Sequence, residues 1–126
     1  MDISFPPVAD PLFARGLDAF RTGRFFEAHE VWERLWKAAP EGDRLFLQGL
    51  IQLAAGLVHC ERGRTAPAMR LFRLARQKLA TYPDGYGGLP LDRLRSALDT
   101  QLGEGRPAGA VSLAEVLRLP QSKEGT

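Results

Sequence analysis

Two adjoining stretches decide the fold: FFEAHEVWERLW at residues 25–36 and LFLQGLIQLAAGLVHC at residues 45–60. On a helical wheel, at about 100° per residue, the first stretch places most of its apolar side chains on one broad arc, whereas the second is apolar nearly all round. The first pattern predicts a helix with one buried face, and the second predicts a central helix that is contacted on several sides. Pro40 and Gly42 lie between the stretches and predict the break between the two helices.

Further helices are predicted on both sides of this pair, because apolar residues recur there at spacings of three and four. Asp10, which precedes a proline, predicts one helix start, and Thr65, as an N-cap, and Pro90 predict two more. Gly23 and Gly63 predict left-handed helix ends. We expect helices at about residues 10–21, 24–39, 43–61, 65–82 and 90–102.

The chain also repeats itself at an offset of 40 residues. The matched pairs are Gly16 with Gly56, Leu17 with Leu57, Gly23 with Gly63, Arg24 with Arg64, and Ala28 with Ala68. Two helical hairpins that end their first helix in the same way produce such a pattern, as in tetratricopeptide-type arrays. Because two copies are too few for a solenoid, we expect an all-α, compact bundle of about five helices with two tetratricopeptide-like helical hairpins.

The chain has the length of one domain, because 126 residues with 44% apolar content are enough for a single core. We assign residues 1–9 to an N-terminal lead and residues 10–104 to the helical bundle. Residues 105–126 are expected to form a linker, a short helix with a capping box of Ser112 and Glu115, and a tail.

Composition favours a cytoplasmic protein with no membrane span. The lone Cys60 cannot form an internal disulfide, and no apolar run approaches the roughly 20 residues of a membrane helix. The sequence starts without the charged and then apolar pattern of a signal peptide. Lysine is scarce beside arginine and asparagine does not occur, which is typical of a thermophile or a GC-rich genome.

Polar side chains interrupt the apolar faces of the two central helices. His29 lies within the apolar arc of the first helix, and Glu33 lies one turn later at its edge. In the second helix, Gln48, Gln52 and His59 follow one narrow stripe. If the helices pack antiparallel, the two sets face each other. The predicted cluster consists of His29, Glu33, Gln48, Gln52 and His59, with Trp32 and Trp36 as walls.

This cluster has three interpretations. Its members can satisfy one another in a buried hydrogen-bond network that fixes the helices, or they can line a small-molecule pocket between the helices. In the third interpretation, His29, Glu33 and His59 bind zinc or iron with an open coordination position. The spacing HExxxE, however, is not the HExxH of zinc peptidases. Apart from such a metal, the sequence specifies no cofactor, and Cys60 is expected to be a small core residue.

A second feature is basic. No acidic residue occurs from Arg62 to Pro83, and five arginines of this segment are candidates for a surface that binds an anionic partner: Arg62, Arg64, Arg70, Arg73 and Arg76. The alternative is a solvated face that is balanced by acids of a neighbouring helix or subunit. No glycine-rich phosphate loop and no exposed aromatic platform accompanies the arginines, so we do not expect nucleic acid.

The motif HxxxExxW, formed by His29, Glu33 and Trp36, is followed by LQGLIQLAAGLVH at residues 47–59 and by an RGR turn. In this order the motifs resemble the bacterial and archaeal family known as domain of unknown function 309. The resemblance covers about Gly16 to Leu94. It implies a small, all-helical, cytoplasmic protein and implies no activity.

Together these features predict a binding or protein-interaction module with a polar His/Glu/Gln cluster in the bundle. The sequence does not identify its partner; another protein and a second copy of the chain are the two candidates. The alternative is a metal-dependent, hydrolase-like enzyme that uses His29, Glu33 and His59.

Overall fold

The computed structural model describes residues 10–105, Leu113 and residues 115–117, and these residues form helices and turns without a strand. The helices are α2 (Pro11–Arg21), α3 (Phe25–Lys37), α4 (Glu41–Glu61), α5 (Thr65–Leu79) and α6 (Leu91–Glu104), with a short 3-10 helix, η1 (Tyr86–Gly88). The predicted all-α bundle is therefore confirmed. The lead at residues 1–9, the capping residue Ser112 and the tail lie outside the described residues, whereas Leu113 and residues 115–117 are helical.

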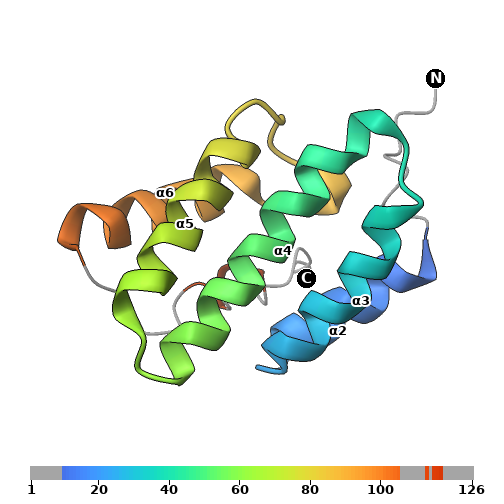
Figure 1. Ribbon diagram of the computed structural model, residues 1–126. Coiled ribbons are helices and arrows are strands. Elements are labelled where there is room, and N and C mark those ends of the chain that lie inside the picture. The colour runs from blue at the N-terminus through green and yellow to red at the C-terminus, as the bar shows by residue number, and fades with distance from the viewer. Residues whose placement is uncertain (1–9, 106–112, 114, 118–126) are drawn as a thin grey trace, which may run out of the picture.

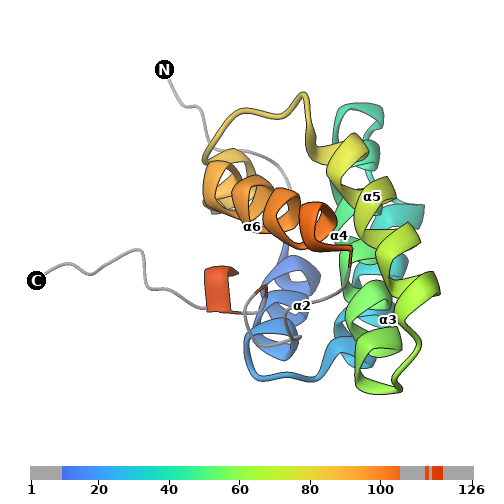
Figure 2. The ribbon, with the colours of Figure 1, turned by 90° about the vertical axis from the view of Figure 1, so that its left-hand side faces the viewer.

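The helices form two layers. In Figure 1, α4 runs through the middle of the front layer, with α3 on one side and α5 on the other. Figure 2 shows α2 and α6 behind this layer. The central position of α4 agrees with its sequence, because Phe46, Leu50, Leu53 and Leu57 are all buried. Within the part of the chain that the structure describes, no helix has both the length and the apolar content of a membrane span.

The two hairpins, α2–α3 and α4–α5, are closed by equivalent contacts. A Cβ atom on Gly16 would lie 2.0 Å from Trp32 Nε1, so only glycine lets α2 come this close to α3. A Cβ atom on Gly56 would lie 2.6 Å from the ring of Phe72. Because Gly56 and Phe72 follow Gly16 and Trp32 by 40 residues, the predicted hairpin repeat is confirmed in the packing.

The turns of the two hairpins are also equivalent. Gly23 and Gly63 have φ angles of 83° and 72°, the left-handed conformation that glycine adopts without strain. The matching backbone hydrogen bonds run from the N–H of Arg24 to the Ala19 carbonyl (2.8 Å) and from the N–H of Arg64 to the His59 carbonyl (2.9 Å). Each hairpin therefore reverses direction through the same short turn.

Two details of the predicted helix ends are wrong. Thr65 is not the N-cap of α5, because Arg64 occupies that place, as Arg24 does in the first hairpin. Helix α5 ends at Leu79 rather than near residue 82. Beyond this end, the Tyr82 hydroxyl donates to the Gly42 carbonyl at the start of α4.

Two tyrosines fasten the loop after α5 to the start of α4. The Tyr82 hydroxyl donates to the Gly42 carbonyl (2.7 Å) and accepts from the N–H of Phe46 (3.1 Å). The Tyr86 hydroxyl donates to the carboxylate of Asp43, which is only 3% exposed. Burial raises the pKa of both phenols, and the hydrogen bond to Asp43 raises the pKa of Tyr86 further. This loop is therefore held by groups that satisfy one another.

Candidate functional site: a groove between α3 and α4

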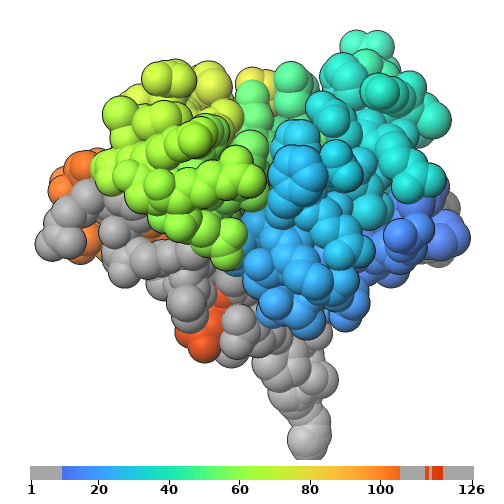
Figure 3. Space-filling model, turned by 60° about the horizontal axis from the view of Figure 1, so that its bottom comes forward, coloured from blue at the N-terminus to red at the C-terminus, as the bar shows by residue number. Residues whose placement is uncertain are grey.

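The antiparallel packing of α3 and α4 divides the predicted cluster between two cavities along their seam. The histidine pocket, of about 170 Å³, is lined by Phe26, His29, Ala55, Val58, His59 and Arg62. The glutamine pocket, of about 200 Å³, is lined by Glu33, Trp36, Gln48, Ile51 and Gln52. We call the two cavities together the α3–α4 groove. Figure 3 views the end where α3 (light blue) begins and shows the two hairpins meeting along a seam.

The division follows from the register of two antiparallel helices. His29 belongs to the second turn of α3 and therefore lies at the level of His59, near the end of α4. Glu33 lies about one turn further along α3, where an antiparallel α4 presents Gln52 and Gln48. The histidines thus share one cavity, and the glutamate shares the other with the glutamines.

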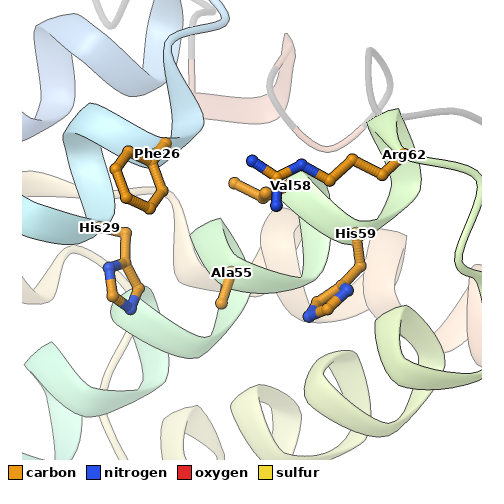
Figure 4. A pocket seen from close by; sticks show the side chains of 6 residues that line it. All are labelled: Phe26, His29, Ala55, Val58, His59 and Arg62. Atoms are coloured by element: carbon orange, nitrogen blue, oxygen red, sulfur yellow. The ribbon is translucent and has the colours of Figure 1, made fainter.

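The histidine pocket has an apolar floor and polar edges. In Figure 4, Phe26 and His29 of α3 lie opposite Val58 and His59 of α4, with the Ala55 methyl group between them. The ring of Phe26 is stacked on that of His29, with centroids 6.2 Å apart and an interplanar angle of 12°. Phe26 is 56% exposed, which is high for a large apolar side chain.

Trp36, which was predicted to form a wall of the cluster, lines the glutamine pocket. The Arg44 guanidinium lies 4.2 Å from the centre of the Trp36 ring and donates to the Trp36 carbonyl at 3.2 Å. A cation over an aromatic face stabilises the orientation of the ring. The indole N–H of Trp36 is nevertheless left without an acceptor.

The groove contains buried polar atoms that have no hydrogen-bond partner. In the described residues these side-chain atoms are His29 Nδ1, His59 Nδ1, Trp36 Nε1 and Gln52 Oε1. All four belong to residues that line one of the two cavities. The mutually satisfied network considered from the sequence is not formed by these atoms, because none of the four has a hydrogen-bond partner.

Trp32 does not line the groove, contrary to the prediction that it forms a wall. Its side chain is 0% exposed and its indole N–H donates to the Phe13 carbonyl at 3.3 Å. The ring fills the space above Gly16, on the side of α3 that faces α2. The helical wheel places both tryptophans on one broad arc, but two different neighbours cover the two edges of that arc.

The predicted metal ligands are only partly brought together. His29 and His59 share a pocket, whereas Glu33 lines the other one. Within the described part of the chain, no three histidine, cysteine, aspartate or glutamate side chains gather as metal ligands would. The geometry therefore offers the two imidazoles without a third protein ligand.

Cys60 follows His59 in sequence but lies on another side of α4. It is half-buried and packs against the core. Burial, and to a smaller extent the nearby Glu61, raises the pKa of its thiol from 9.0 to about 11. A thiol that keeps its proton is a poor nucleophile, which agrees with the predicted core role.

The predicted basic surface is divided as well. Arg76 pairs with Asp99 of α6 at 2.8 Å, so this arginine is balanced by a neighbouring helix. Arg64, Arg70 and Arg73 are exposed. Arg62 lines the histidine pocket, so the basic segment adjoins the groove at this residue.

Some residues of the site were missed from the sequence. Phe26 and Arg62 were not assigned to the cluster. Phe26 lies three residues before His29 and Arg62 lies three residues after His59, a spacing that places each residue on the same helix face as its histidine. The buried Asp43 was also missed, because its partner Tyr86 is distant in sequence. Asp43 lines a third cavity, of about 150 Å³, with Asp10 and several apolar residues.

Known proteins resemble part of this chain. Residues 13–71 match the family model described as "Domain of unknown function (DUF309)". An "Uncharacterized protein" of Aquifex aeolicus (strain VF5) is 29% identical over 86 residues, which are 68% of this chain and 26% of the relative. The "Uncharacterized protein YpuF" of Bacillus subtilis (strain 168) is 45% identical over 51 residues, 40% of this chain and 29% of the relative.

The matched segments are thus a little over a quarter of the length of either relative. The family match begins in α2 and ends in α5, so it contains both lining helices of the groove, although it ends before Leu94. The resemblance to domain of unknown function 309 is confirmed over residues 13–71, which match its family model.

Proposed function

We propose that this protein is an interaction module whose α3–α4 groove binds an extended segment of a partner protein. The observation that carries this proposal is the set of buried, unpartnered polar atoms that line the groove. Leaving a buried polar group without a partner costs about 1–3 kcal/mol. When several such groups lie along one accessible seam, a ligand that supplies the missing partners recovers this free energy.

The size of the cavities favours a peptide over a compact small molecule. Small-molecule pockets commonly enclose about 300–1,000 Å³. The histidine and glutamine pockets enclose about 170 and 200 Å³ and are separate. Two small cavities in a row suit two side chains of one extended segment.

The polar atoms of the glutamine pocket match a peptide backbone. Trp36 Nε1 is a hydrogen-bond donor without an acceptor, and Gln52 Oε1 is an acceptor without a donor. A peptide unit offers one carbonyl oxygen and one N–H group. Main-chain hydrogen bonds supply affinity and side-chain pockets supply specificity in many complexes with extended peptides.

The test is selection of random dodecapeptides, displayed on phage, on the untagged full chain. Ala55 lies between the helices in the histidine pocket, so Ala55→Trp fills that cavity. Ala14 is exposed on α2, away from the groove, so Ala14→Trp adds the same ring elsewhere. Circular dichroism verifies that both variants are folded.

We expect wild type and Ala14→Trp to enrich the same peptide sequences, and Ala55→Trp to lose them. Synthetic copies of those peptides, followed by fluorescence anisotropy, give the affinities. Equal enrichment on all three proteins, or none on any of them, would overturn the proposal.

A further inference from the structure

We infer that the histidine pocket receives the carboxylate of an acidic side chain from the partner segment. This inference rests on the proposed peptide-binding function and specifies its ligand chemistry. It is carried by the polar groups of the pocket, which are supplied by two different helices.

Three groups of the pocket can donate a hydrogen bond to an anion. His29 and His59 each have a buried Nδ1 atom without a partner, and Arg62 contributes a guanidinium. Figure 4 shows the Arg62 side chain extending from the end of α4 past Val58 toward Phe26. A guanidinium presents N–H groups in a planar fork that matches a carboxylate. The lining residues include no aspartate or glutamate, so nothing in the pocket repels an anion.

Arg62 differs from other arginines of the bundle in its pairing. Arg24, Arg76 and Arg95 each form a salt bridge with an aspartate at 2.8–3.0 Å. Among the described residues, no salt bridge to Arg62 is formed. The acidic neighbours in sequence, Glu30 beside His29 and Glu61 beside Arg62, are exposed and do not line the pocket.

Further exposed arginines follow Arg62 in the chain. Arg64, Arg70 and Arg73 are exposed on the adjoining turn and on α5, and no acid occurs from Arg62 to Lys78. The positive start of α3 and the negative end of α4 lie next to each other here, so their helix dipoles offset one another. The charge that selects an anion therefore comes from the side chains, and it favours an acidic segment.

A peptide carboxylate suits the pocket better than RNA does. Proteins that bind single-stranded nucleic acid stack successive bases on several aromatic side chains. Phe26 is the one exposed aromatic of the described groove, and it is already stacked on His29. A cavity of about 170 Å³ next to a single ring has room for one side chain.

The test compares the peptides that are selected by wild type, Arg62→Gln and Arg15→Gln. Arg15 is exposed on α2 and serves as the matched loss of one positive charge. We expect wild type and Arg15→Gln to enrich peptides with Glu or Asp at one fixed position, and Arg62→Gln to lose this preference. Histidine ring signals of ¹⁵N-labelled wild type should shift when such a peptide is added.

Replacing the enriched glutamate by glutamine in a synthetic peptide should weaken binding to wild type at least about tenfold. The same replacement should change the affinity for Arg62→Gln by less than about twofold, because the partner of the carboxylate is already gone. This coupling separates a direct contact from a general effect of charge.

Several outcomes would contradict the inference. Selected peptides that need the groove but have no fixed acidic position would overturn it and leave the proposed function intact. Tighter binding of a 12-nucleotide single-stranded RNA, or displacement of the peptide by millimolar inorganic phosphate, would also overturn it. If Ala55→Trp selects the same peptides as wild type, the proposed function itself fails.

Discussion

The seams inside the hairpins differ from the seam between them. Inside the hairpins, a glycine admits an aromatic ring, as Gly16 admits Trp32 and Gly56 admits Phe72. The buried indole N–H of Trp32 has an acceptor there, the Phe13 carbonyl. Along the seam between the hairpins, cavities remain and the buried polar atoms of the lining have no partner.

Two tryptophans of α3 make this difference clear. Trp32 is 0% exposed and hydrogen-bonded, whereas Trp36, one turn later, is half-buried and its N–H is unpaired. The same residue type is a core element on one edge of the helix and lines a cavity of the groove on the other. The closed seams supply stability, whereas the open seam between α3 and α4 keeps buried polar groups without a partner, which the proposed ligand would satisfy.

The largest effect is expected from breaking the closed seams. Gly16→Ala places a Cβ 2.0 Å from the fully buried Trp32, and Gly56→Ala places one 2.6 Å from Phe72. Forcing an extra methyl group into such packing should lower the free energy of unfolding by roughly 2–3 kcal/mol each. Gly42 of α4 has no atom within 4 Å of its Cβ position, so Gly42→Ala should raise stability by up to about 1 kcal/mol.

Urea unfolding followed by circular dichroism measures all three variants. A Gly16→Ala protein as stable as Gly42→Ala would mean that α2 and α3 have room to separate, and that the hairpin seam is not closed.

A smaller loss is expected from removing a satisfied polar group. Tyr86→Phe deletes the hydroxyl that donates to the buried Asp43 and should cost about 1–3 kcal/mol. The pKa values of Tyr82 and Tyr86 are raised in the folded protein, so the unfolded chain loses these protons first as the pH increases. Wild-type stability should therefore be complete below about pH 10 and fall above it.

Thermal melts of wild type and Tyr86→Phe between pH 8 and pH 11 measure this dependence. The loss of stability with increasing pH should be smaller in Tyr86→Phe, because this variant lacks one of the two phenols whose pKa is raised by folding. Parallel declines would show that Tyr86 does not hold its proton more tightly in the folded state.

In the open seam, between α3 and α4, removing a polar group is expected to leave the free energy of unfolding unchanged or to increase it. Gln52 Oε1 is buried without a partner, so Gln52→Leu removes a group that already destabilises the fold. Stability should stay the same or increase by up to about 1 kcal/mol, while binding of the selected peptides weakens. Urea unfolding and peptide anisotropy measure the two quantities, and a loss above about 1 kcal/mol would mean that Gln52 supports the fold.

The last test needs no substitution. It measures the reactivity of the Cys60 thiol, which follows His59 in sequence but packs against the core. Its pKa of about 11, against 9.0 in the ordinary thiol, leaves on the order of a hundredfold less thiolate at pH 8. Iodoacetamide should therefore label the folded protein about a hundred times more slowly than the urea-unfolded protein, as measured by mass spectrometry. Equal rates would place the thiol on the open side of α4.

The sequence by itself determined the helices, their order and the hairpin repeat. Local rules carry this information: apolar residues at a helical period, glycines that adopt positive φ at Gly23 and Gly63, and a nearly all-apolar segment that has to be central. The same rules found the groove side chains from His29 to His59, because polar residues inside an apolar arc stand out on a wheel. They missed Phe26, and they assigned Arg62 to a basic surface but not to the histidine pocket.

Only the tertiary structure decided which cavity or which neighbouring helix each of those residues contacts. A wheel gives the angle of a side chain about its helix, but not its level along the neighbouring helix or which neighbour covers that angle. The antiparallel register therefore places Glu33 in a different cavity from the histidines. Trp32 packs against α2, whereas Trp36 lines the glutamine pocket. The bond between Tyr86 and Asp43, 43 residues apart in the chain, depends on the same long-range packing.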